Sequence, residues 1–286
     1  MATLNVSLRD LTGQLRKTSS DATHHGHNAD IWRGVFKDPT SSVYPEVAIK
    51  VIRTFFHPEE VNVLNQKLLR EARLWSQLSH ENIVPFLGIA TDMAFSSAPS
   101  LISPYYKIGN LAQFTHTYDV NDDRKWKLVY EIAKGLNYLH NNNVVHGDVK
   151  PANILINDQH HALLVDFGWS RVLELSGFTT KSTPGTIRYM SPELLDPKPS
   201  GGGPVRTSKP ADVWAFAITV TEIFSRIQPY HHIKVEGLLW SFVWQQNGRL
   251  RRADYANYIP SRLWDTLEKC WEGDPQKRLT MKQFLS

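Results

Sequence analysis

The sequence predicts an α+β protein with a strand-rich first part and a larger, mainly helical second part. Short β-branched runs dominate up to about residue 103, and apolar residues at helical spacing dominate after residue 109. The chain has 286 residues, enough for one large domain or for two lobes with a cleft. Residues 104–109 are the expected linker between the two parts.

The first part is predicted to hold several strands and one long helix. Residues 46–52 form a β-branched run, as expected of a strand. Apolar residues then recur every three or four positions over residues 58–79, which predicts a helix. Residues 83–87 and 101–103 are predicted as two further strands.

The second part shows helical periodicity throughout. One apolar face is formed by Leu128, Ile132, Leu136 and Leu139, with two aspartates well placed at the start of the helix. Residues 211–225 are almost all apolar, so this helix is expected to be buried. Trp264, Leu267 and Trp271 mark another helix, and residues 197–210, with three consecutive glycines, are expected to form a surface loop.

Composition limits the classes of function. The net charge of +4 fits an anionic ligand such as a nucleotide and is too diffuse to indicate nucleic acid. The densest basic cluster, Arg249, Arg251 and Arg252, is expected to be a solvated loop. A single cysteine excludes an internal disulfide, and neither a signal peptide nor a membrane-spanning segment is read. A cytoplasmic protein with no membrane and no nucleic-acid partner is therefore expected.

The most informative stretch is residues 146–153, followed by residues 165–168. Asp148 is a candidate base, Lys150 a cation, and Asn153 and Asp166 supply hard oxygen ligands for magnesium. Singly, each of these Asp and Asn residues would be read as a turn residue. Together they are what phosphoryl transfer from ATP requires.

These residues belong to a series of motifs that resembles the protein kinases. Residues 47–50 read Val-Ala-Ile-Lys, the third-strand signature of that family, and residues 146–153 resemble its catalytic loop. Residues 166–168 resemble its metal-binding triplet, and residues 191–193 the triplet that closes its activation segment. The similarity runs from about Asp10 to the last residue.

The resemblance implies a two-lobed kinase fold in a single domain, residues 1–286. The N-terminal lobe, residues 10–103, would hold a small antiparallel sheet with one main helix. Residues 104–109 would be the hinge, and residues 110–286 a mainly helical C-terminal lobe.

The resemblance also implies catalytic roles. Lys50 would hold the α- and β-phosphates of ATP, with Glu71 of the helix 58–79 as its counter-charge. Asp148 would orient the substrate hydroxyl and accept its proton. Lys150 would neutralise the transferring phosphoryl group, and Asn153 with Asp166 would bind Mg²⁺.

A nucleotide pocket follows from the same alignment. Ala48 and Leu155 would sandwich the adenine, and Ile31 would cap it. Ser103 would be the gatekeeper, with Tyr105 and Tyr106 in the hinge. The remaining glycine of the phosphate-covering flap would be Gly26.

Other positions match the scaffold of the family. Asp212 would anchor the catalytic loop, and Arg278 would pair with Glu193. A stacked hydrophobic spine would consist of Trp75, Phe86, His146 and Phe167, so that His146 is expected to be a core residue.

The chain departs from the family pattern at the flap and at the catalytic loop. Only Gly26 of the glycine-rich loop remains, because His24 and Ala29 replace the other two glycines. Gly147 stands where most kinases carry an arginine that contacts a phosphorylated activation segment. Activity is therefore expected to depend less on such phosphorylation. Thr179, Thr180, Ser182 and Thr183 are either candidate phosphosites or part of a Thr/Ser-rich mobile loop, and the sequence favours the two equally.

The expected activity is that of an ATP-dependent serine/threonine kinase of the tyrosine-kinase-like group, in a style that resembles fungal members. Its partners would be a protein substrate and regulatory regions or proteins outside this chain. The degraded flap keeps a second reading open, a pseudokinase that acts as a nucleotide-binding or scaffolding module. A small-molecule phosphotransferase is less favoured, because residues 185–193 resemble a segment that binds peptides.

Overall fold

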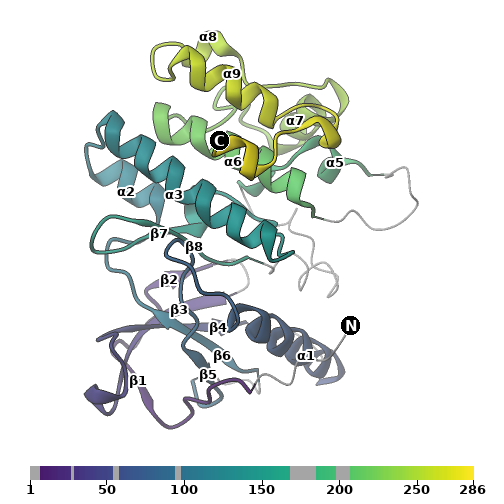
Figure 1. The fold of residues 1–286 in the computed structure, drawn as a ribbon. Helices are drawn as coiled ribbons and strands as arrows, with labels where there is room; N and C mark the ends of the chain where they lie inside the picture. Colours follow the sequence, from purple (N-terminus) through teal and green to yellow (C-terminus); the bar gives the residue numbers. More distant parts are fainter. Residues whose placement is uncertain (1–6, 27–28, 54–57, 94–97, 168–184, 198–206) are drawn as a thin grey trace. The chain divides into compact units, whose positions relative to one another are not determined.

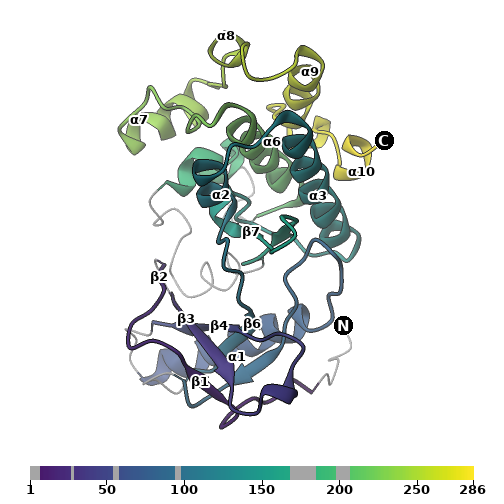
Figure 2. The same cartoon turned by 90° about the vertical axis from the view of Figure 1, so that its left-hand side faces the viewer.

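A computed structural model describes residues 7–26, 29–53, 58–93, 98–167, 185–197 and 207–286 (Figures 1 and 2). The chain divides into two compact units, residues 1–107 and 108–286, which are described in turn. The division falls inside the segment 104–109. The boundaries given above for the lobes and the hinge stay predictions.

The first unit contains an antiparallel sheet and one long helix. The strands are β1 (Leu15–Lys17), β2 (His24–His25), β3 (Ala29–Phe36), β4 (Val47–Ile52), β5 (Gly88–Ala90) and β6 (Ser100–Pro104). Their order is β1-β3-β4-β6-β5, with β2 paired to β3, and each pair is antiparallel. Helix α1 (Pro58–Trp75) runs beside this sheet (Figure 1), and a short 3-10 turn (Pro39–Ser41) lies between β3 and β4. The predicted sheet with one main helix is confirmed.

The sheet is held by an apolar cluster that includes a segment before β1. Leu11 and Leu15 are fully buried against residues of β3, β4, β5 and β6, namely Phe36, Val47, Ile49, Ala90 and Ile102. Burial of this apolar area is the main force that holds the strands together. The segment that starts at Asp10 is therefore part of this core.

One predicted strand is wrong. Residues 84–87 belong to no strand, and the pairing begins at Gly88 in β5. Pro85 has no backbone N–H to donate to a ladder, so the run cannot pair along its length. Leu87 alone donates its N–H to the carbonyl of Ile102, at 2.9 Å. The predicted helix 58–79 also ends earlier, at Trp75.

The described part of the second unit is mainly helical and includes a small hairpin. Its helices are α2 (Leu111–Thr117), α3 (Asp122–Asn141), α5 (Pro192–Leu195), α6 (Lys209–Ser225), α7 (Glu236–Trp240), α8 (Arg252–Tyr255), α9 (Ser261–Cys270) and α10 (Met281–Phe284). The hairpin pairs β7 (Ile154–Ile156) with β8 (Ala162–Leu164). Short turns are formed by Pro151–Asn153, Thr186–Tyr189 and Pro275–Lys277, and Ser241–Gln245 continues α7 as a π-helix.

The two long helices of this unit follow from their sequences. Asn121 caps α3 by accepting the N–H of Arg124, and the predicted apolar face of α3 is buried. Helix α6 is buried almost throughout and carries a Ser208 cap. It begins at Lys209, inside the predicted loop 197–210, because Pro210 fits the first turn of a helix. Residues 198–206 of that loop lie outside the described residues.

Arg249 is not the solvated residue that was expected. Its guanidinium carbon lies 4.6 Å from the ring centroid of Trp214, and its Nε donates to the carbonyl of Trp271 at 3.2 Å. Burial lowers the pKa of this guanidinium. Its neighbours Arg251 and Arg252 pair with Asp254 and Asp265 at the surface, as expected of a solvated loop. Arg249 therefore links the ring of Trp214 to the backbone of Trp271.

Candidate functional site

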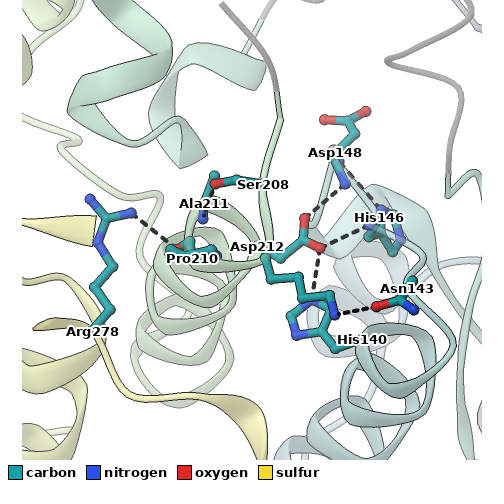
Figure 3. A network of polar contacts seen from close by, with 11 residues as sticks. His140, Asn143, His146, Asp148, Ser208, Pro210, Ala211, Asp212 and Arg278 are labelled. Atoms are coloured by element: carbon teal, nitrogen blue, oxygen red, sulfur yellow. Dashed lines mark hydrogen bonds and ion pairs between the residues drawn. The ribbon is translucent and has the colours of Figure 1, made fainter. Parts of the chain in front are cut away.

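The loop 146–153 is anchored by a buried carboxylate from α6. Asp212 is 1% exposed, and its Oδ2 accepts the N–H of His146 while its Oδ1 accepts the N–H of Gly147, both at 2.8 Å. The ring nitrogen Nε2 of His140 lies 2.9 Å from Oδ2 (Figure 3). Gly147 has a φ of +80°, a left-handed conformation that glycine adopts without strain. The predicted anchoring role of Asp212 is confirmed.

His146 is a core residue, as predicted. Its side chain is fully buried, and burial lowers its pKa. Its ring packs edge-to-face on Phe167 with a centroid distance of 6.2 Å. In the first unit, the rings of Trp75 and Phe86 lie 5.1 Å apart. Each unit therefore contains one pair of the predicted hydrophobic spine.

Asp148, Lys150 and Asn153 form one hydrogen-bonded cluster. The Nζ of Lys150 lies 2.8 Å from Oδ2 of Asp148 and donates to Oγ1 of Thr186 at 2.7 Å. The Nδ2 of Asn153 donates to the carbonyl and to Oδ2 of Asp148, at 2.8 and 2.7 Å. The turn Pro151–Asn153 makes this possible, because it brings Asn153 back to the start of the loop. The structure thus brings three of the predicted site residues together.

Asn153 directly precedes the β7–β8 hairpin in the chain and Asp166 follows it, so both belong to the open end of the hairpin. Asn153 directly precedes β7, and its carbonyl accepts the N–H of Val165 at 3.1 Å, which places the segment after β8 beside it. Asp166 has a φ of +63°, a left-handed conformation that aspartate tolerates. The side-chain amide of Asn153 donates both N–H groups to Asp148, so the Oδ1 of Asn153 is left as the atom that could bind a cation.

This donor set fits Mg²⁺. One amide oxygen and one carboxylate are the hard ligands that Mg²⁺ prefers, and Mg²⁺ completes its six positions with water and phosphate oxygens. Within the described ranges there is no group of three or more His, Cys, Asp or Glu side chains that could hold a metal by itself. Asn153 and Asp166 therefore suit a metal that arrives with a phosphorylated ligand.

The segment 185–193 is fixed to the helices of the second unit. Gly185, with a φ of +82°, donates its N–H to Oε1 of Glu236 at 2.8 Å. The hydroxyl of Tyr189 donates to Oε2 of Glu222 at 2.5 Å. Burial raises the pKa of both side chains, and the Glu222 charge raises that of Tyr189 further. Thr186 is thereby held where Lys150 reaches it.

An ion pair closes this segment, as predicted. Nη1 and Nη2 of Arg278 donate to the two carboxylate oxygens of Glu193 at 2.7 and 2.8 Å. Arg278 also donates to the carbonyls of Pro210 and Glu272, at 3.0 and 2.8 Å. A two-pronged guanidinium pair of this kind fixes orientation as well as distance.

In the first unit, Lys50 lies in the middle of the sheet. It is paired in register with Ile31 of β3 and Leu101 of β6. Glu71 is half-buried on α1. The position of Lys50 on a central strand gives its side chain a rigid base, because both neighbouring strands hydrogen-bond to β4.

The predicted adenine residues of the first unit are neighbours. Ala48 is paired with Ser103, which is 8% exposed on β6. Tyr105 follows β6 and donates its N–H to the carbonyl of Glu46 at 3.1 Å, and Tyr106 beside it is half-buried. In the second unit, Leu155 lies on β7 and forms a bridge with Asn110.

The flap is a β2–β3 hairpin with charged residues beside its Gly26–Ala29 end. Gly26 donates its N–H to the carbonyl of Ala29 at 2.8 Å, and residues 27–28 lie outside the described residues. The Nδ1 of His25 lies 2.8 Å from Oδ1 of Asp30, and the Nε of Arg53 lies 3.6 Å from Oδ2. Arg53 also donates to the carbonyl of Gly26. The sequence drew attention to the replaced glycines and to the histidines of this loop, but it gave no indication that Asp30 pairs with His25 and Arg53.

A family model for protein tyrosine and serine/threonine kinases matches residues 19–286. The chain belongs to this protein kinase family. Serine/threonine-protein kinase CTR1 of Arabidopsis thaliana is 29% identical over 240 residues, which cover 82% of this chain and 27% of that protein. Serine/threonine-protein kinase STY17 of the same plant is 30% identical over 265 residues, which cover 91% of this chain and 42% of that protein. Human receptor-interacting serine/threonine-protein kinase 1 is 27% identical over 272 residues, which cover 88% of this chain and 38% of that protein. The chain thus spans 27–42% of the length of these relatives.

These comparisons confirm the family resemblance and the kinase fold. The relatives are serine/threonine kinases of the tyrosine-kinase-like group. Protein kinases use ATP with Mg²⁺ and bind protein substrates, which confirms the expected nucleotide and metal for this kinase domain. Of the helices in the described ranges, none is long and apolar enough to cross a membrane.

Proposed function

We propose that this kinase domain is an active enzyme that transfers the γ-phosphoryl group of ATP to serine and threonine hydroxyls of a protein substrate. Asp148 orients the hydroxyl and accepts its proton, and Lys150 stabilises charge on the transferring group. Lys50, with Glu71 as counter-charge, holds the α- and β-phosphates. Asn153 and Asp166 bind Mg²⁺, which neutralises phosphate charge when it is bound.

One observation carries the proposal: Lys150 reaches both Asp148 and Thr186. The Nζ of Lys150 lies 2.8 Å from Oδ2 of Asp148 and 2.7 Å from Oγ1 of Thr186, so the base and the segment 185–190 share one cation. A hydroxyl that enters beside Thr186 arrives next to the carboxylate that must take its proton. A positioned base within hydrogen-bonding reach is the geometric requirement for general base catalysis.

The state of the loop supports the same chemistry. Asp148 accepts from Lys150 and Asn153 through Oδ2, which leaves Oδ1 to accept from a substrate hydroxyl. The loop backbone is fixed by Asp212, so the carboxylate does not need to be ordered when the substrate binds. The phosphoryl group then passes to the hydroxyl oxygen as the bond to the leaving diphosphate breaks, while the hydroxyl proton moves to Asp148.

The nucleotide pocket is part of the proposal. Ala48 and Leu155 enclose the adenine, Ile31 caps it, and the backbone near Tyr106 recognises its edge. Ser103 is the gatekeeper, with Tyr105 beside it. Gly26 belongs to the flap over the phosphates.

The setting of the enzyme is proposed on the composition. We infer a cytoplasmic protein without nucleic-acid or membrane partners, regulated by regions or proteins outside this chain. The lone buried Cys270 fits a reducing compartment. The candidate phosphosites Thr179, Thr180, Ser182 and Thr183 lie outside the described residues.

The test combines nucleotide binding with phosphoryl transfer. Thermal unfolding is measured with and without Mg-ATP, and incorporation of labelled phosphate is followed by phosphoamino acid analysis. We expect phosphoserine and phosphothreonine, and a loss of at least about 100-fold in transfer for Asp148→Asn, the range that general base catalysis supplies. The matched control is Asp158→Asn, an exposed aspartate in the β7–β8 turn, which should leave transfer unchanged.

The same data separate the enzyme from a pseudokinase. Stabilisation by Mg-ATP without any transfer, unaffected by Asp148→Asn, would mean that the fold binds nucleotide without turnover. Phosphotyrosine as the main product would overturn the assignment of the hydroxyl class.

A further inference from the structure

The flap of this kinase lacks two of the three glycines that normally shape it, and a cluster of charged side chains lies at the Gly26–Ala29 end of its hairpin. We propose that Asp30 is a positioning residue for ATP, which holds the flap hairpin in one conformation by pairing with Arg53 and His25. This inference rests on the proposed function and deepens it, because it assigns to side chains a role that glycines fill in the usual pattern.

The contacts form a closed ring around the hairpin. Oδ2 of Asp30 lies 3.6 Å from Nε of Arg53, and Arg53 donates to the carbonyl of Gly26. Gly26 in turn donates its N–H to the carbonyl of Ala29, which directly precedes Asp30. Arg53 follows β4, so the ring ties both arms of the hairpin to the strand that carries Lys50. A displacement of the flap from β4 has to break at least one charged contact.

The ring acts on the flap and not on the nucleotide directly. In a strand, successive side chains point to opposite faces of the sheet. Asp30 is paired in register with His25 and Val51, whereas its neighbour Ile31 is paired with Lys50. Asp30 therefore stands on the face opposite to Ile31 and Lys50, which are the residues proposed to contact ATP.

The charges also explain how a carboxylate is tolerated near a phosphate site. An isolated aspartate on the flap would repel the phosphates of ATP. Here the permanent cation of Arg53 pairs with one oxygen of Asp30, and His25 pairs with the other. The side chain of Asp30 is 19% exposed and that of Arg53 is 33% exposed, so this pair is partly shielded from water.

The structural reason for such a device lies in the replaced glycines. Glycine lets a backbone approach phosphates, but a glycine-rich loop must be ordered when the ligand binds. The flap here carries His24 and Ala29 at two of the three positions, which narrows its range of backbone conformations. A side-chain brace then selects one of them before ATP arrives, and a preorganised loop lowers the ordering cost of binding.

The experiment uses the 286-residue chain with Asp30→Ala, Arg53→Met and the double variant. We expect the Kd and KM for Mg-ATP to rise about tenfold in each variant while kcat stays within about twofold, the size expected from losing one preorganised loop. The double variant should be no weaker than either single variant, because both remove the same ring. Adenosine, which has no phosphates, should bind all forms equally.

Hydrogen exchange in the protein without nucleotide supplies a readout independent of catalysis. The N–H groups of Thr23 and Gly26, which bond across the hairpin, should exchange faster in Asp30→Ala. The matched control is Asp92→Ala. The carboxylate of Asp92 joins two distant segments of the same unit by accepting the N–H of Gly13 at 2.9 Å. It should change neither ATP affinity nor exchange in the flap.

Any of four results overturns the inference. Three concern binding: unchanged ATP affinity in Asp30→Ala, an equal loss for adenosine and ATP, or an equal loss in Asp92→Ala. The fourth is unchanged exchange of the Gly26 amide in Asp30→Ala. If the wild-type chain binds Mg-ATP but transfers no phosphate, the proposed enzymatic function fails while the binding and exchange measurements still decide the role of Asp30. If it binds no ATP, both fail together.

Discussion

The catalytic loop and the flap are both held by an aspartate, but the two networks lie in different environments. Asp212 is 1% exposed on α6, a helix that is buried almost throughout, and it accepts the backbone N–H groups of His146 and Gly147 in the loop. Asp30 lies on β3, between β2 and β4, and pairs with Arg53 and with His25, whose side chain is 68% exposed. Buried polar contacts are costly to break, whereas exposed ion pairs contribute little to stability. The contrast indicates that this domain fixes its catalytic loop rigidly and its flap only lightly.

The largest loss of stability is expected when Asp212, the acceptor at the centre of the buried network, is removed. Asp212→Ala leaves the N–H groups of His146 and Gly147 buried without their acceptor, so the free energy of unfolding should fall by about 3–5 kcal/mol. Denaturant unfolding measures this loss. Asp212→Asn keeps one acceptor oxygen and should lower the free energy of unfolding by less, so it can be measured if the alanine variant fails to fold.

The control for Asp212 is an aspartate on the surface of the same unit. Asp265 pairs with Arg252 at 2.8 Å, with a side chain that is 59% exposed. Asp265→Ala should change stability by less than about 1 kcal/mol. Similar losses for Asp212→Ala and Asp265→Ala would contradict the view that burial decides the weight of these contacts.

A second buried contact tests geometry instead of charge. Arg278→Lys keeps the positive charge but cannot make both bonds to Glu193, and it also loses the bonds to Pro210 and Glu272. We expect a loss of about 2 kcal/mol in the free energy of unfolding, because a lysine ammonium does not match two carboxylate oxygens in a plane. A lysine variant as stable as the wild type would show that charge alone holds residues 191–193.

The buried pair Tyr189–Glu222 should make the free energy of unfolding depend on pH, which exposed ion pairs do only weakly. Burial raises the pKa of Glu222, so the folded state holds a proton there that the unfolded state has already released. Stability from this group is therefore present at low pH and is lost as pH rises from about 4.5 through the higher folded-state pKa. Glu222→Gln keeps an oxygen for the Tyr189 hydroxyl and removes the titration.

The measurement is urea unfolding of both forms between pH 4.5 and pH 8. The stability of Glu222→Gln relative to the wild type should improve steadily as pH rises. Parallel curves for the two proteins would mean that Glu222 is not held in a buried, proton-favouring site.

The sequence predicted the buried part of this site better than the exposed part. The contact partners of Asp212, Arg278 and His146 were predicted correctly, because buried polar groups must find partners and a fixed motif leaves few choices. The predicted strand 83–87 failed because apolar pattern alone ignores the missing N–H of Pro85.

The flap cluster could not be predicted in the same way. Hydrophobic periodicity gives no information about His25, Asp30 and Arg53, because all three are polar. The contact of Asp30 with Arg53 also depends on the register between β3 and β4. A sequence does not show which charged residues of a short hairpin pair with one another, because exposed charges are common on any protein surface. The available signal was weak, because Asp30 is the single acidic residue in the stretch 24–33 and Arg53 lies 23 positions further along the chain.

The smallest effect on stability is expected at the flap, although an about tenfold loss of ATP affinity is expected there. Asp30→Asn should change the free energy of unfolding by no more than about 0.5 kcal/mol, and 1 M salt should remove even this difference, because partly exposed ion pairs are screened. Denaturant unfolding at low and high salt measures both values. A salt-independent loss comparable to that of Asp212→Ala would place Asp30 in the rigid frame of the domain and remove the difference between the two regions.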